Sequence, residues 1–152
     1  MPFTGPGGAT LNRRHRALLR ALAPVALMGL IFYASSQHAG EHMDWWEVVL
    51  RKIGHVSGYA LLTTLWAWAL SGVVRRPILI AALIALAYAC TDEFHQTFVA
   101  TRHGTPVDIG VDSIGILIAA GLMQVRQRRP KRGSDVDARG GVVARSSLAR
   151  SP

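Results

Sequence analysis

Long runs of apolar residues set the pattern of this chain. Three of them, at 52–74, 77–99 and 107–125, each approach the roughly 20 residues that a helix needs to cross a ~30 Å hydrocarbon core. None of them alternates polar and apolar positions over about ten residues, as a strand of a membrane barrel does. The pattern therefore predicts three membrane-spanning helices over these ranges.

A shorter apolar run lies nearer the N-terminus, from Ala21 to Ser35. It predicts a helix over 17–36 that spans if Arg20 extends its side chain to the head groups, although Pro24 lies inside it. The alternative is a signal peptide, because basic residues precede the run and small residues follow it. Cleavage would leave the orientation of the other three helices unchanged.

A short segment between the first two runs combines aromatic and acidic residues. Trp45 and Trp46 lie beside Asp44 and Glu47 within the segment 42–50. This composition predicts an amphipathic segment at the outer membrane interface, where indole rings are favoured. The predicted fold is therefore all-α: a polytopic integral membrane protein with a four-helix transmembrane bundle and a short interfacial amphipathic segment.

The basic residues predict the orientation of that bundle. They precede the first helix, join the second to the third and follow the fourth, in the segments 13–20, 75–76 and 126–132. Under the positive-inside rule these segments lie on the cytoplasmic side. We expect a multi-pass protein of the bacterial plasma membrane with both termini in the cytoplasm. Its predicted parts are a basic N-terminus over 1–16, a transmembrane domain over 17–125 and a basic, disordered tail over 126–152.

Composition supports the membrane interpretation over the main alternative. Half of the residues are hydrophobic, and the formal net charge is +8. A basic chain can bind nucleic acid, but membrane orientation explains the same charges, so we expect membrane lipids and no nucleic acid as partners. The single cysteine, Cys90, lies in an apolar run and has no second cysteine to pair with.

Ionisable and polar residues inside the predicted spans gather at the outer ends of three helices. Each costs on the order of 2.5 to 3.5 kcal/mol in a membrane, so four acids facing lipid would cost roughly 10 to 14 kcal/mol. They must face the bundle interior or water. The candidate site residues are Lys52, His55 and Tyr59 on the second helix, Asp92, Glu93 and Gln96 on the third, Arg102 in the loop, and Asp108 and Asp112 on the fourth.

The charges in this cluster do not balance. The four acids oppose only Lys52 and Arg102, which leaves two negative charges in excess. Either His55 and His95 carry protons, or an acid does, or a bound cation completes the site. The sequence does not decide among these three possibilities, so it does not show whether the protein binds a cofactor.

Three blocks of these residues resemble the VanZ-like family of bacterial membrane proteins, which is named after a protein linked to teicoplanin resistance. The blocks are Lys52-x-x-His55-x-x-x-Tyr59, Asp92-Glu93-Phe94-His95-Gln96-x-Phe98, and Arg102 followed by Asp108-x-x-x-Asp112-x-x-Gly115. The resemblance covers about 21–125. It implies the fold and the membrane location, and it points to the cell envelope and to antibiotic resistance.

The same cluster has a purely structural interpretation. Hydrogen bonds between helices hold membrane bundles together, and the acids could serve only as such links. Arg102 could bind a carboxylate or phosphate in bidentate fashion, or pair with Asp108. Gly115, Ala119 and Gly121 predict a close approach of helices rather than a binding role.

Our leading hypothesis is a binding protein for an anionic molecule of the cell envelope, such as a lipid-linked wall precursor or a glycopeptide. Lys52, His55 and Arg102 would hold its anionic groups. One alternative is a membrane hydrolase in which the acids and His55 bind a divalent cation, with magnesium or manganese favoured over zinc. The other is an ion or proton transporter. The sequence does not predict an oligomeric state.

Overall fold

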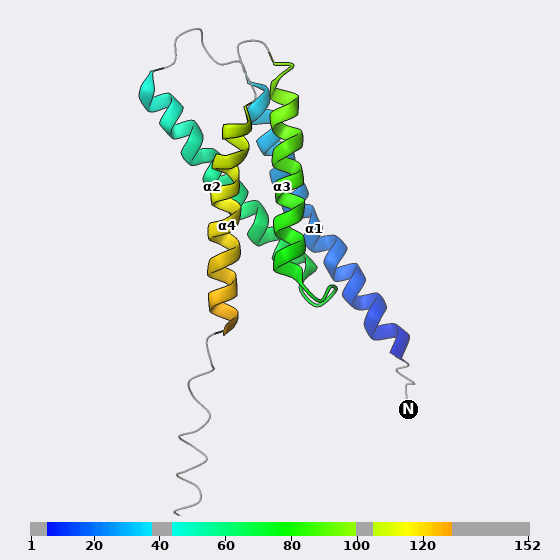
Figure 1. Cartoon of the computed structure of the whole chain (residues 1–152). Coiled ribbons are helices and arrows are strands. Elements are labelled where there is room, and N and C mark those ends of the chain that lie inside the picture. Colours follow the sequence, from blue (N-terminus) through cyan, green and yellow to red (C-terminus); the bar gives the residue numbers. More distant parts are fainter. Residues whose placement is uncertain (1–5, 38–43, 100–104, 129–152) are drawn as a thin grey trace, which may run out of the picture.

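The computed structural model describes residues 6–37, 44–99 and 105–128. These residues form four helices and no strand: α1 (Pro6–Ser36), α2 (Trp45–Leu70), α3 (Pro77–Gln96) and α4 (Pro106–Arg128). Figure 1 shows them running alternately up and down, with α3 and α4 roughly upright and α1 and α2 inclined across them. The prediction of an all-helical fold is confirmed.

Three of these helices are long and apolar enough to cross a membrane. Within the described ranges the candidate spans are His15–Ser36, Pro77–Gln96 and Pro106–Arg128. The helix α2 is not among them, although its 26 residues extend over ~39 Å at 1.5 Å per residue. Polar side chains such as His55, Thr63 and Thr64 lower its hydropathy.

The second helix starts earlier than its apolar run indicates. The predicted division between an interfacial segment and the second helix is not seen, because the residues from Trp45 onward form the first turns of α2. The position of these residues at the membrane interface stays a prediction. The backbone N–H of Asp44 donates a hydrogen bond to Glu47 Oε2 at 2.9 Å, which caps the helix at this point. No glycine or proline interrupts the chain between Glu47 and Lys52, so helical hydrogen bonding continues into the apolar run.

Other helix ends also differ from the predicted ones. The helix α2 ends at Leu70 because Ser71 is extended and Gly72 adopts a φ of 79°, a left-handed conformation that favours glycine. The helix α3 ends at Gln96, three residues before the end of its apolar run. The helix α1 starts at Pro6, and α4 continues to Arg128.

The core lies where α2 packs against its neighbours. Its buried residues are Tyr59, Leu62, Ala85, Ala89 and Ile116. Small side chains on α3 and α4 permit this close packing, as is common between membrane helices.

Gly115 marks the closest approach between α2 and α4. A Cβ atom at Gly115 would lie 2.9 Å from the carbonyl carbon of Val56 and would overlap its carbonyl oxygen. Ala119 is buried on the same face. The expectation for Gly121 is wrong, because this glycine is exposed and a Cβ there would meet nothing within 4 Å.

The two ends of the bundle differ in chemistry. The start of α1, the turn between α2 and α3, and the end of α4 lie at the same end (Figure 1). That end carries Arg20, Arg75, Arg76, Arg126 and Arg128. The guanidinium of Arg20 lies 4.9 Å from the ring centroid of Trp68, which links α1 to α2 there. The predicted polar cluster lies at the opposite end.

Candidate functional site

One polar contact of the cluster joins α2 to α4. His55 Nδ1 lies 3.1 Å from Asp112 Oδ1. Asp112 is completely buried, and its second oxygen, Oδ2, has no hydrogen-bond partner in the part of the chain that the structure describes. A buried carboxylate oxygen without a partner is energetically costly, so it marks a position that needs an explanation beyond packing.

Glu93 approaches this pair from α3. Its Oε2 accepts a hydrogen bond from the backbone N–H of Thr105 at 3.1 Å, and its Oε1 accepts one from Gln96 Nε2 at 3.4 Å. Three potential ligand atoms lie within 4.8 Å of one another, one each from His55, Glu93 and Asp112. The fold therefore brings a histidine and two buried carboxylates from three helices to one point.

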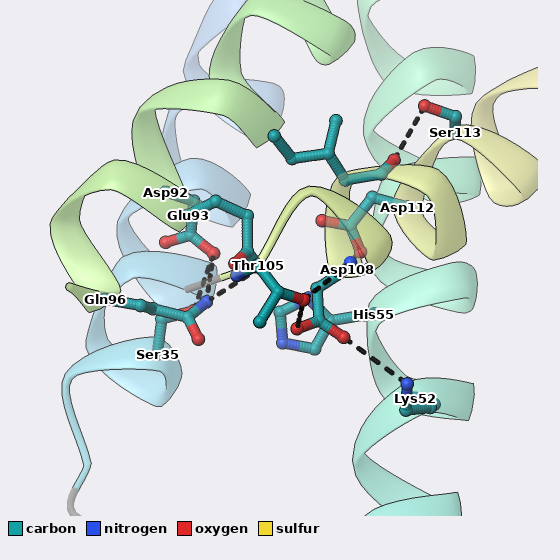
Figure 2. Close-up of polar contacts among 11 residues, drawn as sticks. Ser35, Lys52, His55, Asp92, Glu93, Gln96, Thr105, Asp108, Asp112 and Ser113 are labelled. Atoms are coloured by element: carbon teal, nitrogen blue, oxygen red, sulfur yellow. Dashed lines mark hydrogen bonds and ion pairs between the residues drawn. The ribbon is translucent and has the colours of Figure 1, made fainter. Parts of the chain in front are cut away.

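Asp92 faces α1 instead. Its Oδ2 accepts hydrogen bonds from Ser35 Oγ at 2.7 Å and from Gln96 Nε2 at 3.2 Å (Figure 2). Adjacent positions on a helix point about 100° apart, so Asp92 and Glu93 contact different neighbours. Asp92 thus anchors the C-terminal end of α1 to α3.

Lys52 and Asp108 form the exposed rim of the cluster. Lys52 Nζ lies 3.4 Å from Asp108 Oδ1, and the two side chains are 46% and 35% exposed. Thr105 Oγ1 donates a hydrogen bond to Asp108 Oδ2 at 2.7 Å, at the start of α4. An exposed ion pair of this kind contributes at most about 1 kcal/mol to stability.

Tyr59 extends the cluster inward along α2. Its ring centroid lies 6.2 Å from that of His55 and 6.2 Å from that of Tyr88. The residue is fully buried, and among the described residues its hydroxyl has no hydrogen-bond partner. The spacing of Lys52, His55 and Tyr59 predicts one helical face, and the structure arranges the three from the rim to the core.

Two residues of the sequence motifs lie elsewhere. The ring of His95 packs 4.2 Å, centroid to centroid, from that of Phe32 on α1, so it does not join the carboxylates. Arg102 lies outside the described residues, so its predicted role stays a prediction.

The structure adds three residues to the predicted set. Ser35 and Thr105 donate the hydrogen bonds to the carboxylates described above. Arg51 lines a cavity of about 370 Å³ between α1 and α2, together with His55 and Tyr59. The spacing of these three α2 residues, four apart, could have indicated Arg51, whereas nothing in the sequence points to Ser35 as the partner of Asp92.

The cavity has both apolar and polar walls. Ile31 and Ala34 of α1 and Gly58 of α2 form its apolar part, while Arg51 and Gln37 supply polar groups. Its volume falls within the roughly 300 to 1,000 Å³ of ordinary ligand pockets. A molecule with one charged end and one apolar end matches these walls.

The chain is thus a helical integral membrane protein with a polar site at one end of its bundle. The fold, the apolar helices and the buried polar cluster support this class together. The family model for VanZ/LLP1 matches residues 20–127, and the chain belongs to that family. The resemblance seen in the sequence motifs is thereby confirmed. No curated protein and no solved structure matches the chain.

Proposed function

We propose that this protein binds the anionic head group of a lipid-linked envelope molecule in the cavity between α1 and α2. The observation that carries the proposal is the position of Arg51 and His55 on the wall of that cavity, beside apolar residues of both helices. Arg51 supplies a guanidinium, which binds phosphate oxygens through charge-assisted hydrogen bonds. The apolar wall suits the first part of an isoprenoid or acyl chain.

The proposal includes a topology: four spans, with both termini in the cytoplasm of a bacterium and the polar cluster in the outer leaflet. The fourth span is α2, in which Tyr59 and Thr63 are buried and whose length exceeds the ~30 Å of the hydrocarbon core. The helix ends and the turn that carry Arg20, Arg75, Arg76, Arg126 and Arg128 lie at one end of the bundle, which the positive-inside rule assigns to the cytoplasm (Figure 1).

Cysteine labelling tests this topology. In a Cys90→Ala background, a cysteine that replaces Arg75, in the turn between α2 and α3, should resist a membrane-impermeant maleimide in intact cells. A cysteine that replaces Trp45, which is 78% exposed at the start of α2, should react. Both should react after the membrane is permeabilised. Labelling of position 75 in intact cells would contradict the proposed orientation.

Native mass spectrometry of the full chain in detergent tests the binding proposal. We expect a polyprenyl phosphate to bind and the uncharged polyprenol to bind at least tenfold more weakly. Arg51→Gln should weaken binding of the phosphate at least tenfold, because a hydrogen bond to a charged group contributes about 1.5 to 3 kcal/mol.

Arg76→Gln is the matched control, because Arg76 is an exposed arginine at the opposite end of the bundle. Its affinity for the phosphate should equal that of the wild type. Equal affinities for phosphate and alcohol, or equal losses in the two variants, would refute the site. The family is named after a protein linked to teicoplanin resistance. The cellular readout is therefore the glycopeptide susceptibility of cells that carry Arg51→Gln.

A further inference from the structure

We infer that His55, Glu93 and Asp112 form a binding site for a divalent cation of the magnesium or manganese type. Their ligand atoms lie within 4.8 Å of one another and come from α2, α3 and α4. Ligands on opposite sides of a small divalent ion at ~2.1 Å are ~4.2 Å apart, so small side-chain rotations close the site. Two carboxylates with one imidazole suit manganese or magnesium better than a soft metal.

Two buried oxygen atoms without hydrogen-bond partners among the described residues support the presence of a ligand at this point. Asp112 Oδ2 and the Tyr59 hydroxyl are both buried, and no described residue donates to or accepts from either of them. Both residues are completely inaccessible to solvent. Tyr59 lies one turn below His55 on α2, and the centroids of the two rings are 6.2 Å apart. A cation at the cluster would engage the free carboxylate oxygen of Asp112.

The surroundings of the three ligands match those of a metal site. Glu93 is oriented by hydrogen bonds from the Thr105 N–H and from Gln96, as carboxylate ligands of metals usually are. His55 belongs both to the cluster and to the wall of the cavity between α1 and α2. His55 therefore connects the cluster to the cavity.

One part of the inference rests on the proposed function. The cation explains how an acidic cluster can lie beside the binding site of an anionic ligand. Asp92, Glu93 and Asp112 would repel a phosphate if they were ionised and unneutralised. A divalent cation reverses that local charge and offers open coordination positions to phosphate oxygens. The cation and Arg51 would then hold the head group from two sides.

The experiment uses Mn²⁺ alone as the probe. Full-length protein in lipid nanodiscs is treated with a chelator, exchanged into metal-free buffer and titrated with Mn²⁺ under electron paramagnetic resonance. We expect one tightly bound Mn²⁺ per chain, with a pulsed spectrum that shows coupling to an imidazole nitrogen. His55→Gln should remove the nitrogen coupling, and Asp112→Asn, which preserves shape, should weaken Mn²⁺ binding at least tenfold.

Glu47→Gln is the matched control, since Glu47 is a carboxylate of α2 that caps the helix outside the cluster. It should bind Mn²⁺ as the wild type does. Bound Mn²⁺ without nitrogen coupling in the wild type overturns the inference, and this result does not depend on the folding of any variant. Equal affinities of the wild type and Asp112→Asn overturn it as well.

Titration with a polyprenyl phosphate, with and without chelator, separates this inference from the proposed function. Mn²⁺ bound at the cluster with no phosphate bound under either condition supports the cation site and refutes the proposed function. Phosphate bound equally under both conditions, with no Mn²⁺ at the cluster, supports the proposed function and refutes the cation site.

Discussion

Replacing Gly115 with alanine should lower the free energy of unfolding by about 3 kcal/mol, because the added methyl group meets backbone rather than a flexible side chain. Its carbon would overlap the carbonyl oxygen of Val56 and lie 3.1 Å from the Val56 Cα. Neither atom can rotate away, so α2 and α4 must separate along the interface that also aligns His55 with Asp112. Unfolding in mixed micelles with increasing sodium dodecyl sulfate, followed by circular dichroism, measures the effect.

Gly121→Ala serves as the control for helix propensity. Gly121 lies on the same helix and is exposed, and a methyl group added there would have nothing within 4 Å of it. This substitution should leave stability unchanged or raise it by up to about 1 kcal/mol. Equal stability of the two variants would show that α2 and α4 do not approach each other as closely as the structure indicates.

The fold was largely readable from the sequence, because hydrophobic runs of a fixed length have few alternatives to a membrane helix. The apolar runs did not predict the exact ends of the helices, because local hydrogen bonds and backbone conformation set those ends. The cap at Asp44 lets α2 begin two turns before its apolar run, and the left-handed Gly72 ends it before Val74. Neither effect changes hydropathy, so a pattern of apolar positions does not reveal it.

For the candidate site, the sequence predicted only how far along the helices the polar groups lie, and not which of them pair. Acids and bases at the outer ends of three helices had to meet, since lipid exposure is too costly. Which acid meets which base depends on the rotation and crossing of the helices. In the structure His55 contacts Asp112, and Lys52 pairs with Asp108. Asp92 turned to Ser35 of α1, a contact that no spacing indicates.

The contact between His55 and Asp112 allows a direct test of whether the cluster exists for stability or for binding. His55→Leu should cost about 3 kcal/mol, because it leaves a fully buried carboxylate without its remaining partner. Asp112→Val should cost less, since the His55 side chain is 19% exposed and can stay neutral and partly hydrated. The double variant should regain at least half of the loss caused by His55→Leu, because well-packed apolar residues often replace a buried polar pair without cost.

The ion pair of Lys52 with Asp108 provides the comparison, since it also joins α2 to α4 but lies at the exposed rim. Lys52→Leu should change stability by less than about 1 kcal/mol. A double variant of His55 and Asp112 that recovers none of the loss caused by His55→Leu would mean that the pair serves as an interhelical link. Recovery in the double variant would mean that the bundle holds together without the pair. The buried carboxylate would then be retained for what it binds, because no gain in stability accounts for it.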